Sequence, residues 1–232
     1  MRKYLLLLVL CTACAHSVRP SAPAAPSDTG RVAVEGGELY YESRGSGPAV
    51  VLLHGGGLDH TSWDPQVDPL SRAFRVIRYD ARGHGRSTPP TGPFSMADDL
   101  GRVLDHLGVR RAHLVGLSMG AGAAYGFAAR HPERVETLTL VSMSGPPPGV
   151  PREPGAPPDL TEAAGRELLR GMPMPRLLVL GERDSPVVQA VADSVRAQAP
   201  GVEVVRIPGA HLPNRDAPEA FNLLLLRFLR QR

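Results

Sequence analysis

The feature that most constrains this chain is a short glycine–serine motif between a predicted strand and a predicted helix. Residues 116–120 read G-L-S-M-G, which fits the pattern G-x-S-x-G with Ser118 at its centre. Residues 111–115 are typical of a short buried strand, and the alanine-rich residues 121–130 are typical of a helix. A strand that turns at once into a helix strains the corner residue and leaves room only for small side chains beside it. The motif therefore predicts that Ser118 projects at a helix N-terminus, where the Met119 N–H can stabilise an oxyanion.

A second interpretation treats the same motif as a glycine-rich turn in which Ser118 only caps the helix. The chain contains 25 glycines, so the motif alone does not decide between the two. The residues that follow the other predicted strands supply the further test.

Predicted strands and helices alternate along most of the chain. This alternation predicts an α/β fold with a mostly parallel central sheet, helices on both faces and an N-terminal antiparallel hairpin. In such sheets the ligand site lies at the carboxyl ends of the strands. The hairpin is expected over residues 31–35 and 38–44, the further strands over 49–53, 74–79, 111–115, 135–141, 176–180 and 202–207, and the helices over 63–73, 95–107, 121–130, 160–171, 186–198 and 218–229.

The first 15 residues are predicted to be an export signal, with a basic start, a short apolar run and small residues after it. The sequence Thr-Ala-Cys that ends at Cys14 favours a bacterial lipoprotein, lipidated at Cys14 and facing the periplasm or the exterior. Cleavage after Ala15, which would give a soluble secreted protein, is the alternative. Residues 16–30 are rich in Pro, Ala and Ser and predict a linker, followed by one folded domain over residues 31–232.

Composition excludes several functional classes. Without the first 30 residues, which hold three of the 26 basic and one of the 23 acidic residues, the charges nearly balance, so no nucleic-acid partner is expected. Both cysteines lie in the first 15 residues, which leaves no disulfide and no cysteine nucleophile in the folded part. No His, Asp or Glu cluster has the spacing of metal ligands, so neither a metal nor another cofactor is predicted.

Two residues after late strands supply the partners that a serine nucleophile needs. A serine hydroxyl requires an adjacent base, and the base requires a group that fixes its tautomer. His211 follows the last predicted strand, and Asp184 follows the strand before it. The chain order Ser118, Asp184, His211 is that of one known class of serine hydrolases.

Other side chains compete for these roles. His84 is the second candidate base and Glu182 the second candidate acid. Asp80 also follows a strand, but three nearby arginines favour an ion pair or a turn-bracing role for it. The strand over residues 135–141 ends in S-M-S-G and offers no carboxylate.

The loop after residues 49–53 reads H-G-G-G and is predicted to complete the oxyanion hole. Gly56, with Gly57 as a further candidate, would present a backbone N–H to complement that of Met119. His54 is expected to brace this loop.

Together these segments resemble the α/β-hydrolase fold superfamily, over residues 31–229. The resemblance rests on residues 53–57 (LHGGG), 79–87 (YDARGHGRS), 116–120 (GLSMG), 181–184 (GERD) and 209–211 (GAH). It is closest to the esterase, enol-lactonase and perhydrolase branch, and it implies hydrolysis through an acyl-enzyme on Ser118. Members of this branch usually carry a helical cap, whereas residues 146–158 are too proline-rich for helices and predict a flap in its place.

The sequence thus predicts a serine hydrolase that cleaves carboxylic esters or lactones. Ser118 attacks, His211 moves the proton, Asp184 orients His211, and no cofactor takes part. An acyltransferase or perhydrolase with the same triad, and a non-catalytic binding domain on the same fold, are the alternatives. A small ester or lactone and a membrane, through the lipid anchor, are the expected partners.

Overall fold

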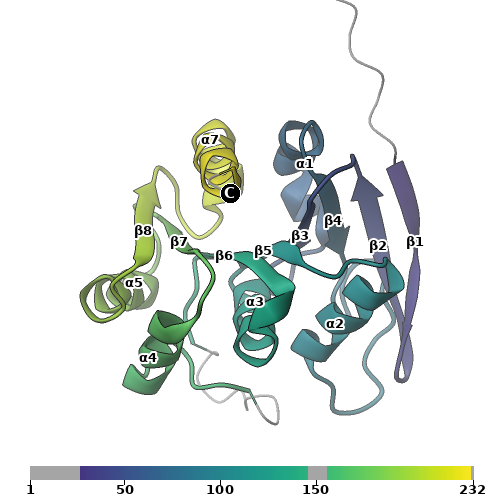
Figure 1. Cartoon of the computed structure of the whole chain (residues 1–232), viewed down its shortest axis with the longest axis horizontal. Helices are drawn as coiled ribbons and strands as arrows, with labels where there is room; N and C mark the ends of the chain where they lie inside the picture. Colours follow the sequence, from purple (N-terminus) through teal and green to yellow (C-terminus); the bar gives the residue numbers. More distant parts are fainter. Residues whose placement is uncertain (1–26, 146–155, 231–232) are drawn as a thin grey trace, which may run out of the picture.

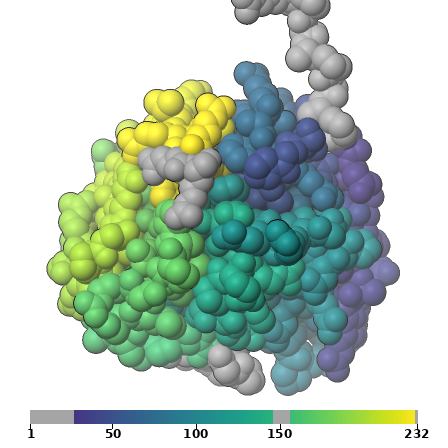
Figure 2. Space-filling model, in the orientation of Figure 1, coloured from purple at the N-terminus to yellow at the C-terminus, as the bar shows by residue number. Residues whose placement is uncertain are grey.

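The chain was analysed as a computed structural model, which describes residues 27–145 and 156–230. One eight-stranded sheet with the order β1-β2-β4-β3-β5-β6-β7-β8 runs through the molecule (Figure 1). Only β2 runs against the others, because it pairs antiparallel with both of its neighbours. In the space-filling view, the segments that contain β1 and β8 lie on opposite sides of the molecule (Figure 2). The α/β fold with an N-terminal antiparallel hairpin is therefore confirmed. The strands are β1 (Ser27–Val34), β2 (Gly37–Arg44), β3 (Ala49–Leu53), β4 (Arg75–Tyr79), β5 (Ala112–Leu117), β6 (Val135–Val141), β7 (Arg176–Gly181) and β8 (Val202–Ile207).

The helices begin where the sequence supplies a cap or a proline. Ser95 caps α2 by accepting a hydrogen bond from the Asp98 N–H, and Ser185 caps α5 ahead of Pro186. The helices are α1 (Asp64–Ser71), α2 (Met96–His106), α3 (Met119–Arg130), α4 (Ala163–Gly171), α5 (Pro186–Gln198), α6 (Pro213–Asp216) and α7 (Pro218–Leu229), with 3-10 turns η1 (His60–Trp63) and η2 (Pro132–Arg134).

Two hydrophobic cores lie on opposite faces of the sheet. Side chains of α2, α3, α4 and α5 pack on one face, and those of α1 and α7 pack on the other (Figure 1). The strand β3 is buried throughout, so its alternate residues contribute to both cores: Val51 to the first and Val50 to the second. Burial on both faces explains why this strand reads as a continuous apolar run.

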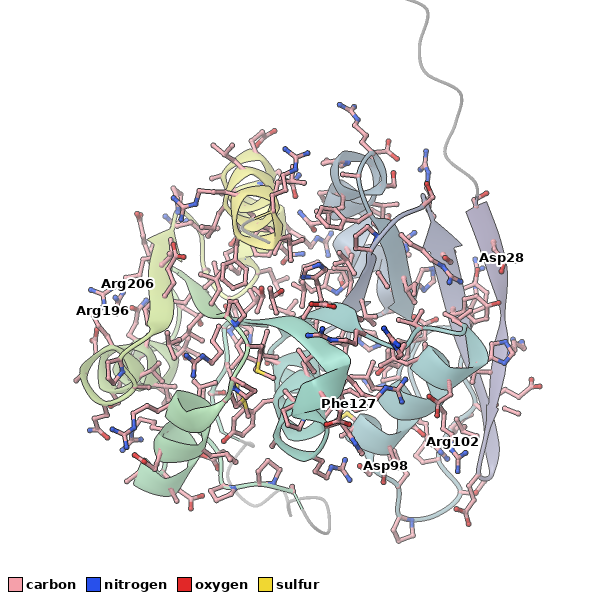
Figure 3. The ribbon with its side chains drawn as sticks, in the orientation of Figure 1. Asp28, Asp98, Arg102, Phe127, Arg196 and Arg206 are labelled. Carbon is pink, nitrogen blue, oxygen red and sulfur yellow. The ribbon has the colours of Figure 1, made fainter. Side chains whose placement is uncertain are left out.

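The helices α2 and α3 lie next to each other on one face of the sheet (Figure 1). Asp98 of α2 pairs with Arg130 of α3 at 2.8 Å, and Phe127 of α3 is 1% exposed in the core (Figure 3). The helix α3, which follows the motif serine, is thus held against both the sheet and its neighbour.

The start of the folded domain differs from its prediction. The strand β1 begins at Ser27, so residues 27–30 belong to the sheet and not to the linker. Asp28 accepts a hydrogen bond from the Tyr41 hydroxyl, and Gly30 lies against the Tyr41 ring, where a Cβ atom would come within 2.9 Å of ring carbons. Backbone pairing with β2 and this contact extend the strand into a segment whose composition predicts none.

Several other predictions concern residues that the structure does not describe or describes only in part. The export signal, the Cys14 lipidation, most of the linker and most of the proline-rich segment 146–158 lie outside the described residues. Between β6 and β7, α4 is the helix that the described residues contain, and it begins three residues later than predicted. Within the described ranges, no helix combines the length and the apolar character needed to cross a bilayer.

Candidate active site

The motif serine occupies the corner between β5 and α3. Ser118 has φ 50° and ψ −108°, a region that side-chain-bearing residues rarely adopt. Its backbone N–H donates to the Val141 carbonyl at 2.8 Å, which fixes the corner to β6. The Ser118 side chain makes no capping hydrogen bond, so the interpretation of Ser118 as a helix cap is wrong. Because φ/ψ strain of this kind persists only where the surroundings impose it, the corner is held in place by the packing around it.

The two flanking glycines explain why the motif is needed. A Cβ atom at Gly116 would lie 2.3 Å from the Gly120 carbonyl oxygen, and one at Gly120 would lie 2.4 Å from the Leu53 carbonyl oxygen. Both distances are far below any tolerated contact, so no other residue fits without moving the backbone. The glycines let β3, β5 and α3 approach closely, which places Ser118 beside the end of β3.

The predicted base and acid meet at the same edge of the sheet. His211 follows β8 and Asp184 follows β7, and these parallel neighbours end side by side. The His211 Nδ1 and Asp184 Oδ1 atoms are 2.9 Å apart. The Asp184 side chain is fully buried, whereas that of His211 is 45% exposed. A buried carboxylate on Nδ1 leaves Nε2 as the nitrogen available for proton transfer.

This contact shifts the acid–base properties of both partners. Burial alone would raise the pKa of the Asp184 carboxyl, but the hydrogen bonds from His211 and the Ser185 N–H, together with the nearby Ser142 hydroxyl, outweigh it and lower that pKa. The hydrogen bond to Asp184 raises the pKa of His211 above its ordinary value of 6.5, against the opposing effect of burial. Glu182, the second candidate acid, is exposed and lies outside this pair.

The serine lies on the same sheet edge but is not yet engaged by the base. Among the described residues, no hydrogen bond joins Ser118 to His211. Catalytic hydrogen bonds of this kind are often long before substrate binds, so the separation does not remove His211 as the base.

The glycine loop (residues 54–58) lies beside the serine corner. A Cβ atom at Gly56 would be 3.9 Å from the Met119 side chain, so the two predicted oxyanion residues are neighbours. Met119 is the first residue of α3, where backbone N–H groups have no partner inside the helix. Gly57 has φ 70° and donates its N–H to His84 Nε2 at 3.4 Å. Since that N–H is engaged, Gly56 is the better placed of the two glycines.

Two histidines hold the glycine loop. The Ala81 N–H donates to His54 Nε2, so the His54 proton is on Nδ1, which donates to the Gly55 carbonyl at 2.8 Å. His54 therefore braces the loop as predicted. His84, the second candidate base, lies 5.1 Å from the His54 ring and has its Nδ1 2.9 Å from the Arg82 carbonyl. With both nitrogens in contact with backbone groups, His84 supports the loop and is poorly placed to act as a base.

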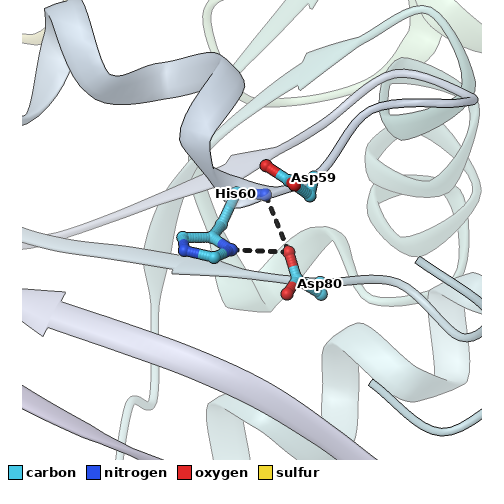
Figure 4. A group of neighbouring side chains, drawn as sticks. All are labelled: Asp59, His60 and Asp80. Carbon is cyan, nitrogen blue, oxygen red and sulfur yellow. Dashed lines mark hydrogen bonds and ion pairs between the residues drawn. The ribbon is translucent and has the colours of Figure 1, made fainter. Parts of the chain in front are cut away.

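A second His–Asp pair, which the sequence analysis missed, joins His60, just after this loop, to Asp80. Asp59, His60 and Asp80 bring potential metal-ligand atoms within 4.8 Å of one another, although the spacing in the sequence suggests no such group (Figure 4). The ligand atoms already have partners, however. Asp80 Oδ1 accepts from the His60 N–H at 2.7 Å and contacts His60 Nδ1 at 2.8 Å, while Asp80 Oδ2 accepts from the Arg86 N–H. The group is satisfied without an ion, and the absence of a metal remains a prediction.

The role of Asp80 also differs from the ion pair considered for it. Its partners are His60 and backbone N–H groups, and Gly85 approaches so closely that a Cβ atom there would lie 2.2 Å from Asp80 Oδ2. The nearby arginines pair elsewhere: Arg78 with Glu42 and Asp64, and Arg82 with Asp99. Asp80 therefore braces the turn after β4, which was the other role predicted for it.

Similarity to known proteins agrees with this arrangement. A family model described as the alpha/beta hydrolase fold matches residues 48–163. The chain belongs to this family. The matched stretch contains the glycine loop and Ser118 but ends before Asp184 and His211, so the pairing of these two is supplied by the structure.

Individual members of this alpha/beta hydrolase family resemble the chain over different lengths. A protein named as a candidate carbamate hydrolase, RutD, from Caulobacter sp. (strain K31) is 41% identical over 124 residues, which cover 49% of this chain and 46% of that protein. The chain thus spans about half the length of such relatives. An enol-lactonase from Burkholderia xenovorans LB400 matches with TM-score 0.76 and 26% identity, over 87% of this chain and 100% of its own. A thermophilic esterase from Thermogutta terrifontis matches with TM-score 0.71 and 27% identity, over 88% and 98%.

Proposed function

We propose that this protein is a serine hydrolase that cleaves carboxylic esters or lactones through an acyl-enzyme on Ser118. The observation that carries the proposal is the strained corner serine, at φ 50°, on the sheet edge that also holds the His211–Asp184 hydrogen bond. The similarity to an enol-lactonase and an esterase supports the bond type, and the carbamate hydrolase relative names a related bond to test.

The chemistry follows from the residues in two half-reactions. Ser118 Oγ attacks the carbonyl carbon while its proton moves to His211 Nε2, and the Gly56 and Met119 N–H groups stabilise the oxyanion. Collapse of this intermediate breaks the bond to the leaving alcohol, which takes the proton from His211. Water then attacks the acyl-enzyme, again losing its proton to His211, and the acid is released with Ser118 restored. Asp184 keeps the proton of His211 on Nδ1 and stabilises the imidazolium that forms in each half.

A fluorophosphonate probe tests this proposal on the purified full chain. The probe reacts with activated serines, and peptide mass spectrometry locates the adduct. We expect an adduct on Ser118 that is absent in Ser118→Ala and in His211→Ala and retained in the control Ser144→Ala. Folded protein without an adduct would contradict the activated serine and favour the binding-domain alternative.

Turnover then tests the bond type. Ester hydrolysis should be lost in Ser118→Ala, in which the nucleophile is missing but the fold is intact, as circular dichroism would show. p-Nitrophenyl esters of increasing chain length, simple lactones and aryl carbamates form the substrate series. Turnover of carbamates alone would retain Ser118 as the nucleophile and contradict the preference for esters and lactones.

A further inference from the structure

A second serine shares the unusual backbone of Ser118. Among the described residues, Ser118 and Ser142 are the two residues other than glycine with positive φ, at 50° and 48°. They follow the neighbouring strands β5 and β6, so both lie at the carboxyl edge of the sheet. The sharp strand-to-helix turn accounts for the first, whereas the described residues directly after Ser142, 143–145, form no helix. A positive φ at a serine raises the free energy of the folded state, so the conformation of Ser142 requires a separate explanation.

Ser142 is fixed in the interior next to β7. It is 0% exposed, and its backbone N–H donates to the Val179 carbonyl at 2.8 Å. Its hydroxyl oxygen is buried and has no hydrogen-bond partner at the geometry of the structure. A buried hydroxyl without a partner is costly, and native proteins usually satisfy it.

Asp184, the acid of the predicted triad, has a buried oxygen that lacks a hydrogen-bond donor. Asp184 Oδ1 accepts from the Ser185 N–H at 2.7 Å and contacts His211 Nδ1 at 2.9 Å. Asp184 Oδ2 is buried and has no partner. A buried hydroxyl that lacks an acceptor and a buried carboxylate oxygen that lacks a donor therefore lie at the ends of adjacent strands. The Ser142 hydroxyl also helps to lower the pKa of Asp184, which agrees with this placement.

We propose that Ser142 is a positioning residue whose Oγ–H donates to Asp184 Oδ2. This contact requires the Ser142 side chain to rotate until its hydroxyl points at Asp184 Oδ2. With Oδ2 held by Ser142, the carboxylate plane is fixed and Oδ1 faces His211 Nδ1. The positive φ at Ser142 is then the backbone conformation that turns this side chain inward. This inference rests on the proposed function, because it gives Asp184 the role of orienting the base.

Substitutions at Ser142 separate the hydroxyl from the backbone. Ser142→Ala removes the hydroxyl and keeps the strain of positive φ, while Ser142→Gly removes both. We expect each to lower kcat for p-nitrophenyl acetate by about tenfold, the effect of one hydrogen bond to a charged group, with little change in KM. Ser144→Ala is the matched control, because Ser144 lies on the same loop and donates to the Gly145 carbonyl. Unchanged kcat in both Ser142 variants would overturn the proposal.

A double-mutant cycle tests whether Ser142 acts through Asp184. In an Asp184→Asn background the carboxylate is gone, so Ser142→Ala should cause no further loss of kcat. A full additional tenfold loss would show that Ser142 acts elsewhere and would overturn the proposal.

A readout without turnover keeps this inference distinct from the proposed function. The His211 Nδ1–H proton, hydrogen-bonded to a buried carboxylate, should give a far-downfield proton NMR signal. We expect this signal to shift or broaden in Ser142→Ala and Ser142→Gly and to stay in place in Ser144→Ala. If wild-type protein hydrolyses no ester but the signal responds, ester hydrolysis fails and the Ser142 contact stands. If the enzyme is active but the signal is the same in wild type and in both Ser142 variants, the Ser142 contact is refuted and the proposed function stands.

Discussion

The molecule contains two histidine–aspartate pairs with nearly the same contact and different surroundings. His60 Nδ1 lies 2.8 Å from Asp80 Oδ1, and His211 Nδ1 lies 2.9 Å from Asp184 Oδ1. In the first pair the His60 side chain is 5% exposed and its Nε2 lies 3.3 Å from Glu42 Oε1. In the second pair the His211 side chain is 45% exposed, and within the described residues its Nε2 has no such partner.

The difference lies in the second nitrogen and not in the shared contact. A histidine with a carboxylate on each nitrogen is held as a structural link, here between β2, the turn after β4 and η1. A histidine whose Nε2 reaches solvent can exchange a proton with a substrate. Neither distance to aspartate nor burial of the aspartate separates the two pairs, because both aspartates are buried. The accessible Nε2 is what makes His211 the candidate base.

Replacement of the two histidines should give the largest difference in kcat between the two pairs. His211→Ala removes the base and is expected to lower kcat for ester hydrolysis by about 10⁶-fold, the scale seen when a triad member is deleted. The fold should remain, because His211 is half-exposed. Single-turnover acylation measured beside far-ultraviolet circular dichroism checks both statements. Equal losses of kcat in folded His60→Ala and His211→Ala would contradict the assignment of separate roles.

The two aspartates should differ in the same way. Asp184→Asn keeps the shape of the side chain but favours the wrong tautomer of His211, so we expect kcat to fall by about 10⁴-fold. Asp80→Asn is the matched control, since its amide would face the Arg86 N–H and disturb the turn rather than the chemistry. Steady-state kinetics per folded molecule should show a large loss only in Asp184→Asn. A comparable loss in Asp80→Asn would mean that the turn after β4 takes part in catalysis.

The losses of stability should follow the opposite order to the losses of kcat, with the larger loss at His60. His60→Ala leaves the buried carboxylate of Asp80 without its side-chain partner, and we expect the free energy of unfolding to fall by about 3–5 kcal/mol. Chemical denaturation by urea measures this change. His211→Ala, compared under the same conditions, should cost less, because the space left by a half-exposed side chain admits water to the Asp184 carboxylate. If His60→Ala unfolds at the wild-type midpoint, the first pair is not a structural link.

The sequence predicts those parts of the site whose requirements are local. Gly116 and Gly120 are readable in the motif because the close approach of backbones that demands them recurs at a fixed spacing around Ser118. The order of strands and helices is equally readable from apolar periodicity. His60 and Asp80 are 20 residues apart, so no local sequence pattern predicts their contact. The same holds for the proposed contact of Ser142 with Asp184, because these residues follow different strands. The strand β1 was placed too late because pairing with β2, and not its own composition, makes residues 27–30 extended.

The pH dependence gives the finest test of the second pair. The hydrogen bond to Asp184 raises the pKa of His211 above its ordinary value of 6.5, and protonated His211 cannot accept the Ser118 proton. The rate constant kcat/KM should therefore fall about tenfold per pH unit below this raised pKa, and the fall should begin at lower pH in Asp184→Asn. Stability should follow the opposite course. Because the pKa is higher in the folded protein, the contribution of the charged pair is complete below about pH 6.5 and is lost as pH rises through the folded pKa.

Two measurements check the direction in which kcat/KM and stability change with pH. The first is the pH profile of kcat/KM for wild type and Asp184→Asn. The second is the difference in melting temperature between wild type and His211→Ala, which should shrink as pH rises, whereas catalysis improves over the same interval. A wild-type profile that falls only at or below the ordinary histidine pKa of 6.5 would show that Asp184 does not hold the His211 proton, since raised basicity and orientation come from the same hydrogen bond.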